Sequence, residues 1–351
     1  MNIVVLAGGL SPERNVSLAT GGQIANALTA NGHHVLLVDS YVGIDDIDTF
    51  DAAYEKYRQT DYGRGIPADE PDLAAIRREY GDGTSLIGPG VVRCCRLADV
   101  VFLGLHGSIG ENGQLQAMLD IFGVTYTGSG YAASLLAMDK LLSKRMISFT
   151  DVPTAPYQVL NIANMSEAEF LAALTDRPLP YVVKPRSGGS SIGVTVVTSA
   201  EDVARALHYA KSCEDEILIE QYIAGREFSV GILGDRALPA IEVISHAEFF
   251  DYTAKYQGTS EEICPADIPA ELEQTLEGYA LQAHRALGLE GYSRSDFIVD
   301  ASGSVYWLEA NSLPGATGES LIPKEARAAG IAYNDFCETL VRQALAKRPR
   351  Y

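Results

Sequence analysis

The sequence predicts an α/β fold, α+β in its C-terminal part, that is divided into three domains. Three observations predict it. Residues 2–38 read as strand, glycine turn, helix and strand, which is a βαβ unit. A glycine-rich loop at 184–193 lies between two strand-like segments, and an acidic strand hairpin follows at 292–309. The chain has 351 residues, which is long enough for several packed domains.

Charge and cysteine usage narrow the class of protein. The formal charge is −19, from 27 basic and 46 acidic residues. Nucleic acids and anionic membranes bind basic faces, so we expect neither as a partner. The N-terminal apolar run is too short for a signal peptide or a membrane span, and no basic segment precedes it. The five cysteines are scattered and form no CxxC pair. We therefore expect a cytoplasmic protein without a disulfide framework or a zinc site.

The first domain is expected to span residues 1–128. Its apolar first strand ends at Gly8-Gly9, and apolar residues at helical spacing follow it. The expected elements, in order, are strand 2–7, helix 15–30, strand 34–38, strand 99–105, helix 113–122 and a short strand with a turn at 123–130. Residues 41–90 are polar and acidic and close with a Gly/Pro-rich segment. They predict an insertion, with a helix at 69–80 as its best element and no visible chemistry.

A central domain, 129–223, and a C-terminal domain, 224–351, follow. Residues 131–148 form one strongly amphipathic pattern that predicts a single helix, and Pro153 and Pro156 mark a linker after it. The remaining expected elements are hairpin 181–184 with 193–197, helix 200–210, strand 216–221, strands 227–233 and 237–243, helix 270–287, strands 292–299 and 304–309, and terminal helices.

The glycine-rich loop, Lys184-Pro-Arg-Ser-Gly-Gly-Ser-Ser-Ile-Gly193, is the first candidate site. Small residues let backbone amides approach phosphate oxygens closely. A strand follows the loop, whereas a Walker A loop opens a helix. A hairpin flap over nucleotide phosphates is the functional interpretation, and a plain flexible turn is the alternative. Lys140 and Lys184 are candidate phosphate contacts, although either lysine alone is more often a solvated charge.

The acidic hairpin is the second candidate site. Asp296 lies within one apolar strand and Glu309 ends the next, so both carboxylates can meet, and Asn311 adds an amide oxygen. Such oxygens are the ligands that Mg²⁺ prefers. Arg294 shares a strand face with Asp296 and could stabilise an oxyanion. A surface hairpin with a salt bridge is the alternative.

Taken together, these motifs resemble those of the ATP-grasp ligases, and among them the D-alanine–D-alanine ligase family. The resemblance covers nearly the whole chain apart from 41–90. The segments that carry it are GGLSPERNVSLATG (8–21), LHGSIGENGQLQAML (105–119), TYTGSG (125–130), AMDKLLSK (137–144), VVKPRSGGSSIG (182–193), FFDYTAKY (249–256), SRSDF (293–297) and WLEANSLPGATGESL (307–321).

The resemblance implies a three-domain ATP-grasp fold with an N-terminal βαβ domain and with ATP between the other two domains. It implies a cytoplasmic homodimeric enzyme that makes D-alanyl-D-alanine through a D-alanyl phosphate, for peptidoglycan precursor synthesis. ATP would be the co-substrate, and Mg²⁺ or Mn²⁺, as two ions, the cofactor. Asp296, Glu309 and Asn311 match the metal ligands.

Substrate roles also follow from the resemblance. Glu13 matches the residue that holds the ammonium of the first D-alanine, and His106 matches a histidine near that substrate. Ser190 and Tyr256 match hydrogen-bonded partners of Glu13 that order the closing loop.

The second substrate and the oxyanion are assigned in the same way. Lys255 and Ser320, with the adjoining Leu321, match groups that hold the carboxylate of the second amino acid. Arg294, with the backbone of Gly315, matches the oxyanion site. The residues that match nucleotide contacts are Lys140, Lys184, Gly189, Ser191, Glu220, Tyr222, Ile223, Glu227 and Asn311.

Three positions depart from the family pattern: Ser295, Ala316 and Glu319. Glu319 adjoins Ser320 and could alter the second substrate, or could face solvent.

Three alternative functions remain open: a ligase that uses D-serine, a catalytically silent ATP-binding protein, and a dinucleotide-dependent oxidoreductase. The last is disfavoured because no GxGxxG follows the first strand.

Overall fold

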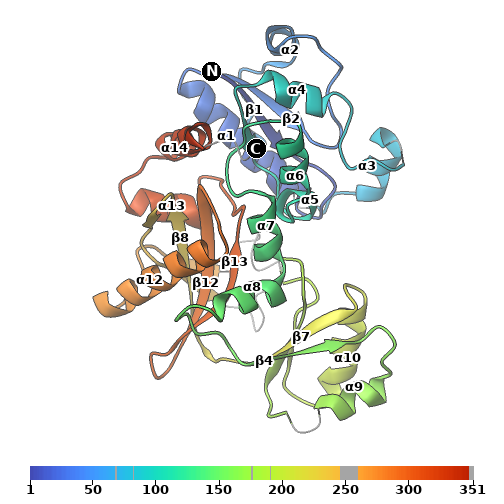
Figure 1. Cartoon of the computed structure of the whole chain (residues 1–351), viewed down its shortest axis with the longest axis vertical. Coiled ribbons are helices and arrows are strands. Elements are labelled where there is room, and N and C mark those ends of the chain that lie inside the picture. The colour runs from blue at the N-terminus through green and yellow to red at the C-terminus, as the bar shows by residue number, and fades with distance from the viewer. Residues whose placement is uncertain (68, 82, 175–176, 190, 246–259, 348–351) are drawn as a thin grey trace.

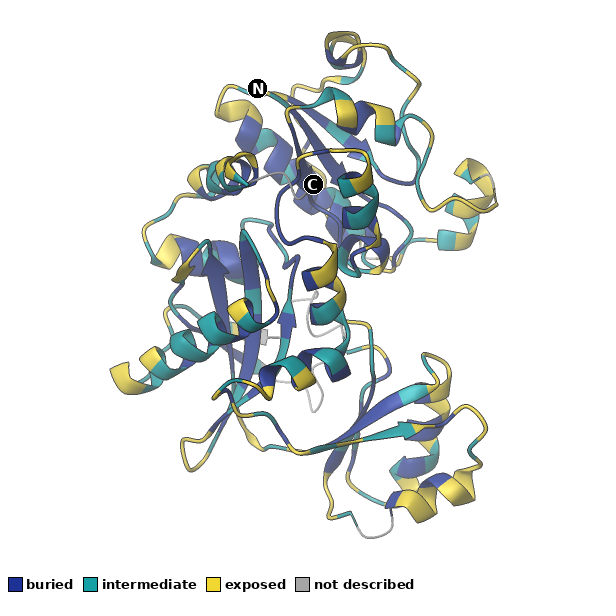
Figure 2. Cartoon of the chain, viewed as in Figure 1, coloured by how far each residue is buried: buried dark blue, intermediate teal, exposed yellow. Residues whose placement is uncertain are grey.

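The computed structural model describes residues 1–67, 69–81, 83–174, 177–189, 191–245 and 260–347. Three sheets organise this part of the chain. Their strand orders are β2-β1-β3, β4-β7-β5-β6 and β11-β10-β8-β12-β13, with β9 paired to β8. Figure 2 shows that strand residues make up most of the buried interior, while helix α3 projects from the molecule and has no buried residue.

The first sheet confirms the βαβ start. β1 (Asn2–Ala7) runs parallel to β2 (His34–Asp39) and to β3 (Val100–Leu103). β1 and β3 are almost entirely apolar and buried, as expected of a parallel sheet covered on both faces. Helix α1 (Arg14–Ala30) packs against the sheet. The short helices α5 (Ser108–Glu111) and α6 (Gln114–Ile121) follow β3.

The C-terminal helix completes the core of this first sheet. α13 (Leu321–Ala328) and α14 (Tyr333–Ala346) close the chain, and α14 packs against α1 and β3. Figure 1 shows α14 beside α1. Phe336, Leu340 and Val341 are buried in the same cluster as the strands of β1 and β3. The first hydrophobic core is therefore built from both ends of the sequence.

The insertion contains α2 (Phe50–Tyr57) and α3 (Leu73–Tyr80), and α4 (Val91–Leu97) follows it. It packs on the first domain, with α2 against β2 and the segment around Tyr62 against α1. The expected helix at 69–80 is shorter because Asp72 caps it, accepting a hydrogen bond from the Ala75 amide. The segment before α3 is held to α1 where Asn26 Oδ1 accepts from the Tyr62 amide at 2.9 Å.

Gly22 marks where the insertion touches α1 most closely. A Cβ added at Gly22 would lie 2.2 Å from the Tyr62 carbonyl oxygen. We expect Gly22→Ala to lower the free energy of unfolding by about 1–3 kcal/mol, because backbone must move. Gly278→Ala is the matched control: it lies within a helix with nothing near its Cβ and should stabilise by about 0.5–1 kcal/mol. Urea denaturation measures both, and equal effects would contradict the contact.

The single helix expected at 131–148 is wrong. The structure has α7 (Tyr131–Met138) and α8 (Lys140–Ile147), separated at Asp139, whose backbone is extended (φ −88°, ψ 101°). The Asp139 carboxylate accepts a hydrogen bond from the Leu142 amide at 2.9 Å and forms an ion pair with Arg186 at 2.6 Å. This cap opens a new helix in the middle of the amphipathic pattern.

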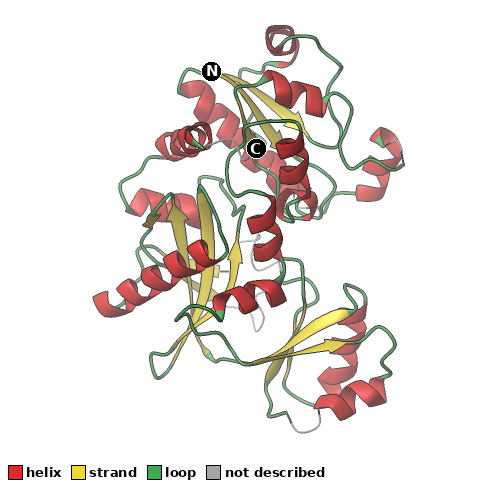
Figure 3. Ribbon diagram, viewed as in Figure 1, coloured by secondary structure: helices red, strands yellow, loops and turns green. Residues whose placement is uncertain are grey.

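The four-stranded sheet is antiparallel and carries the glycine-rich flap. Its strands are β4 (Tyr157–Asn161), β5 (Tyr181–Pro185), β6 (Thr195–Val197) and β7 (Glu216–Gln221). The predicted hairpin is confirmed, since β5 pairs with β6 across the loop. Figure 3 shows α9 (Glu167–Leu174) and α10 (Glu201–Lys211) together on one face of this sheet.

The third sheet holds the acidic hairpin. Its strands are β8 (Gly225–Leu233), β9 (Arg236–Ala237), β10 (Ile241–Ser245), β11 (Ser260–Ile263), β12 (Tyr292–Asp300) and β13 (Val305–Asn311). The single strand expected at 237–243 is wrong: it is interrupted between β9 and β10, where Pro239 has no amide to donate to a ladder. Helix α12 (Ala270–Ala286) packs on one face, and α13 contacts β8 at Gly231 on the other.

Candidate active site

A cavity of about 820 Å³ lies between the second and third sheets. Of the candidate nucleotide and metal residues, those that line it are Lys140, Lys184, Gly189, Ser191, Glu220, Tyr222, Ile223, Glu227, Asp296 and Glu309. Arg294 and Asn311 do not line it, although they lie on the same two strands. The glycine loop and the acidic hairpin, distant in sequence, therefore share one cavity.

Lys140 holds the flap at its base through two hydrogen bonds to backbone carbonyls. The Lys140 ammonium donates a hydrogen bond to the Gly188 carbonyl, and the Lys140 amide donates to the Arg186 carbonyl at 2.8 Å. Gly188 and Ser191 have positive φ (100° and 58°), and both line the cavity together with Gly189, so the loop presents small residues to it. Ser190 lies outside the described residues.

The three candidate metal ligands are brought together by strand register. Asp296 pairs with Glu309 across β12 and β13, and Arg294 pairs with Asn311. Lys140 Nζ lies 3.4 Å from Glu309 Oε2. The Asn311 amide oxygen accepts from the Leu313 amide at 2.9 Å, so part of its capacity is already used. Two carboxylates that face one cavity are a suitable donor set for a hard cation.

Arg294 forms a two-point ion pair with Asp296. Nε and Nη2 each donate to one carboxylate oxygen at 2.8 Å, and Ser229 Oγ donates to Asp296 Oδ1 at 2.6 Å. Burial alone would lower the pKa of Arg294, but the charges of Asp296, Glu309 and Glu325 hold that pKa above its ordinary value. Arg294 is therefore a fixed cation whose planar group is oriented by its own strand.

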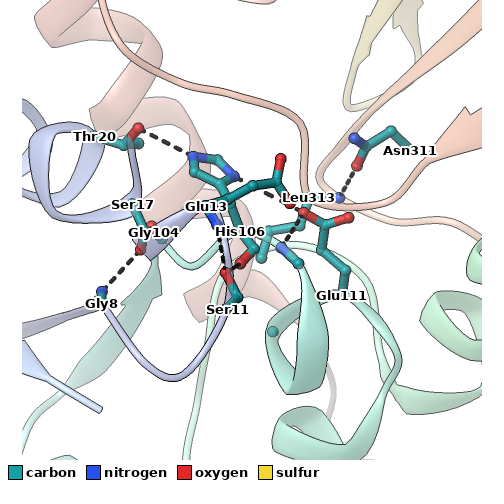
Figure 4. A network of polar contacts seen from close by, with 12 residues as sticks. Gly8, Ser11, Glu13, Ser17, Thr20, Gly104, His106, Glu111, Asn311 and Leu313 are labelled. Carbon is teal, nitrogen blue, oxygen red and sulfur yellow. Dashed lines mark hydrogen bonds and ion pairs between the residues drawn. The ribbon is translucent and has the colours of Figure 1, made fainter. Parts of the chain in front are cut away.

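A second polar cluster lies at the carboxyl ends of β1 and β3, shown in Figure 4. Glu13 precedes α1, and its amide donates to Ser11 Oγ at 3.1 Å. Its carboxylate lies over Gly107, where an added Cβ would come within 2.7 Å of Oε2. His106 is buried and shares a 3.0 Å hydrogen bond between Nε2 and Thr20 Oγ1. Burial lowers the pKa of His106, while the Glu13 charge opposes that shift.

Glu111 belongs to this cluster and was missed by the sequence reasoning. Its carboxylate accepts from the Gly107 amide at 2.7 Å and lies 3.9 Å from His106 Nδ1. Burial first, and then the charge of Glu13, raise the pKa of Glu111 to about 8, while Arg294 opposes the shift. The available signal was an acidic residue in the glycine-rich segment that follows His106, which folds as the short helix α5. Figure 4 shows Asn311, at the end of β13, beside the cluster, and the charge of Arg294 acts on Glu111. The cluster therefore lies next to the acidic hairpin.

The raised pKa of Glu111 predicts a pH dependence of stability. A carboxyl whose folded pKa (about 8) exceeds the ordinary value of 4.5 gives stability that is complete below about pH 4.5 and is lost as the pH rises through 8. Glu111→Gln cannot ionise and keeps that stability at all pH values. It should therefore match the wild type near pH 5 and exceed its melting temperature at pH 9. If Glu111→Gln and the wild type had equal melting temperatures at pH 9 as well as at pH 5, the predicted pH dependence would be wrong.

Ser320 and Gly315 form a compact turn before α13. Ser320 Oγ accepts from the Thr317 amide at 3.1 Å, and an added Cβ at Gly315 would lie 3.0 Å from that oxygen. The Gly318 amide donates to Gln23 of α1 at 2.7 Å, which fixes the turn against the first domain. Leu321 begins α13 directly after Ser320. Lys255 and Tyr256 lie outside the described residues.

The three departures from the family pattern receive structural explanations. Ser295 faces the core, where its hydroxyl accepts from Trp307 Nε1 at 3.3 Å. Ala316 is buried, and its carbonyl accepts from the Tyr333 hydroxyl at 2.7 Å. The Glu319 side chain is 81 % exposed and lies 3.7 Å from Lys324. Its charge is therefore directed to solvent and to a lysine.

Comparisons with known proteins agree over the whole chain. A family model described as D-ala D-ala ligase N-terminus matches residues 2–129, and one described as D-ala D-ala ligase C-terminus matches residues 146–342. A D-alanine–D-alanine ligase of Pediococcus pentosaceus is 40 % identical, covering 97 % of both chains. One of Geotalea uraniireducens is 39 % identical, covering 98 % of this chain and 96 % of the relative.

Solved structures give the same result. A D-alanine–D-alanine ligase from Bacillus anthracis superposes with a TM-score of 0.72 at 29 % identity, covering 98 % of this chain and 97 % of that one. The VanG D-Ala:D-Ser ligase from Enterococcus faecalis superposes with a TM-score of 0.76 at 25 % identity, covering 97 % and 98 %.

Proposed function

The chain belongs to the D-alanine–D-alanine ligase family, and from that premise we propose that it joins two D-alanine molecules with ATP through a D-alanyl phosphate, for peptidoglycan precursor synthesis. The observation that carries the proposal is the position of Arg294. It is paired with a cavity carboxylate on one side and influences Glu111 of the polar cluster on the other. A cation placed between two such sites can stabilise charge that develops where their occupants react.

The polar cluster is the proposed site of the first D-alanine. That substrate is a small zwitterion, so its ammonium needs an anion, which Glu13 supplies, and His106 borders the same space. The turn containing Ser320 and Leu321 would hold the carboxylate of the second D-alanine, with Lys255. Ser190 and Tyr256 would order the loop that closes the site and excludes water.

The cavity is the proposed ATP site. Lys140 and Lys184 would neutralise phosphate charge beneath Gly189 and Ser191, and Glu220, Tyr222, Ile223 and Glu227 would contact the adenosine. An ATP complex of a Bacillus anthracis relative supports ATP as the nucleotide. In this organisation residues 1–128, 129–223 and 224–351 act as three domains, with α14 of the third packed on the first and with ATP between the second and the third.

Mg²⁺ or Mn²⁺, as two ions, is the proposed cofactor. In the described residues no three His, Cys, Asp or Glu side chains form a ready metal cluster. Asp296, Glu309 and Asn311 nevertheless fit Mg²⁺, which keeps few protein ligands and takes the others from phosphates and water. Bound there, the metal would spread the negative charge of the phosphates. Each carboxylate has spare lone pairs, so Asp296 can keep Arg294 as a partner.

Reaction is then a matter of position and charge. Glu13 would hold the ammonium of the first D-alanine and the lysines the phosphates, so that the substrate carboxylate attacks the γ-phosphate and ADP leaves. The amino group of the second D-alanine, after losing a proton, then attacks the acyl carbon. Arg294 and the Gly315 backbone stabilise the tetrahedral oxyanion before phosphate leaves.

We further propose a cytoplasmic homodimer. None of the helices in the described part of the chain has the length and apolar content needed to span a bilayer.

A D-alanine–D-serine ligase is the second candidate, supported by the likeness to the Enterococcus faecalis enzyme. The deciding experiment follows ADP and phosphate release with ATP, Mg²⁺ and D-alanine, beside tubes with L-alanine, D-serine plus D-alanine, and D-lactate plus D-alanine. Products are identified by mass spectrometry. D-alanyl-D-alanine from D-alanine alone is expected. A dominant mixed product would favour the second candidate, and no turnover with any D-amino acid would refute both.

A further inference from the structure

A fully buried lysine lies behind the proposed ATP cavity. Lys144 follows Lys140 by about one turn of α8, and its side chain is 0 % exposed. Lys140 lines the cavity, whereas Lys144 does not. Removing an ammonium from water is costly unless a negative partner compensates it. The partner of Lys144 therefore decides what this residue contributes.

That partner is Glu220, a cavity residue. Lys144 Nζ lies 3.2 Å from Glu220 Oε1, and Lys184 Nζ lies 2.9 Å from Oε2. The Glu220 side chain is only 3 % exposed. Lys144 also lies 5.6 Å from the centre of the Tyr157 ring, and Tyr157 faces Glu220 across β4 and β7. The Glu220 carboxylate therefore forms ion pairs on two sides, with Lys184 in the cavity and with Lys144 behind it.

Positive charge exceeds negative charge around the Glu220 carboxylate. Two lysines share one glutamate, and burial lowers the pKa of Lys144 to about 8, with Lys184 adding to the shift and Glu220 opposing it. Burial would raise the pKa of Glu220, but the two ammonium charges outweigh burial and lower it. The carboxylate therefore stays ionised, and its orientation depends on both lysines.

We propose that Lys144 is a positioning residue for the nucleotide base, acting through Glu220. By holding Oε1 from behind, it keeps the carboxylate turned so that its remaining lone pairs accept a hydrogen bond from the exocyclic amino group of adenine. Without it, Lys184 is the carboxylate's remaining cationic partner, and the carboxylate turns toward that lysine. This inference rests on the proposed function, in which the cavity takes ATP.

The arrangement predicts base selectivity. Adenine offers an amino group to the carboxylate, whereas hypoxanthine offers a carbonyl oxygen at the same place, which a carboxylate repels. A carboxylate free to rotate loses this discrimination. The preference for adenosine over inosine diphosphate therefore reports the orientation of Glu220, independently of turnover.

The experiment measures dissociation constants for ADP and IDP by isothermal titration calorimetry at pH 7.5. The variants are Lys144→Met, Lys144→Arg, Glu220→Gln and the double variant Lys144→Met/Glu220→Gln. Lys144→Met should weaken ADP binding about tenfold, the scale of one lost charge-assisted hydrogen bond, and should change IDP binding much less. Lys144→Arg, which keeps the charge, should restore most of the preference.

Two comparisons separate positioning from mere stability. The double variant should bind ADP no more weakly than Glu220→Gln alone, because both changes remove the same interaction. Lys347→Met is the matched control: it removes a lysine whose partners include Glu290 and the Gly128 carbonyl, both outside the cavity, and should leave both constants unchanged. If Lys144→Met does not fold, Lys144→Gln, which keeps a donor without the charge, takes its place.

The failures are distinguishable. Unchanged ADP binding in Lys144→Met, or equal loss for ADP and IDP with additive effects in the double variant, would overturn the positioning role alone. A wild type that binds neither nucleotide would overturn the proposed function and this inference together.

Discussion

Replacing Arg294 by alanine is expected to lower kcat for dipeptide formation by about 10²–10³-fold, the usual cost of removing one preorganised oxyanion donor. The guanidinium is held by two 2.8 Å hydrogen bonds to Asp296, so no reorganisation is needed when the oxyanion forms. The KM for ATP should change far less, because Arg294 does not line the nucleotide cavity. Initial-rate kinetics with D-alanine and ATP varied separately measure both.

Arg294→Lys is the matched variant. Lysine keeps the charge but cannot form the two-point contact to Asp296, so it should recover only part of kcat. Thermal denaturation of both variants shows whether the loss comes from unfolding, since an unpaired buried Asp296 is itself destabilising. A folded Arg294→Ala protein with nearly normal kcat would remove Arg294 from the mechanism.

Trp307→Ala is expected to lower the free energy of unfolding by about 3–5 kcal/mol, the usual range for losing a large aromatic side chain from a core. Trp307 is 0 % exposed in the core of the third sheet. Its Nε1 donates to Ser295 Oγ, and its backbone amide donates to the Pro153 carbonyl at 2.8 Å. The substitution leaves a cavity and a buried hydroxyl without its donor.

Trp307→Phe separates these two contributions, because phenylalanine fills most of the space but donates no hydrogen bond. It should cost clearly less than alanine. Urea unfolding followed by far-UV circular dichroism is the measurement, since the chain has only 1 tryptophan and both variants lack its fluorescence. Equal costs for both variants would mean that packing at this position contributes little.

The strands and hairpins were predictable from sequence where a local pattern of apolar residues and glycine turns is enough to specify them. β1 was predicted to the residue, and the hairpin of β5 and β6 was correct in kind, since alternation and glycine turns are local signals. The break at Asp139 was missed because the amphipathic pattern continues across it. The deciding signal was the capping carboxylate, which also binds Arg186, a residue far along the chain.

The residues of the candidate site also fall into those that could be predicted from sequence and those that could not. Asp296, Glu309 and Arg294 could be placed together because a hairpin fixes their register. Glu111 and Lys144 could not, because each gains its character from burial beside charges on other elements. From sequence alone, a lysine in an amphipathic helix is expected to be a solvated charge. The contact of Lys144 on α8 with Glu220 on β7 shows instead that Lys144 is part of a buried ion pair.

Helix α14 has a consequence for how the protein is made. The core around β1 and β3 includes Phe336, Leu340 and Val341, so a nascent chain carries an unfinished first core until these residues emerge from the ribosome. The central sheet, whose core residues all lie between 160 and 219, can fold earlier as a local unit. The sheet of β1 and β3 is thus translated before the central sheet but completed after it, and a premature stop before Tyr333 leaves part of its apolar surface exposed.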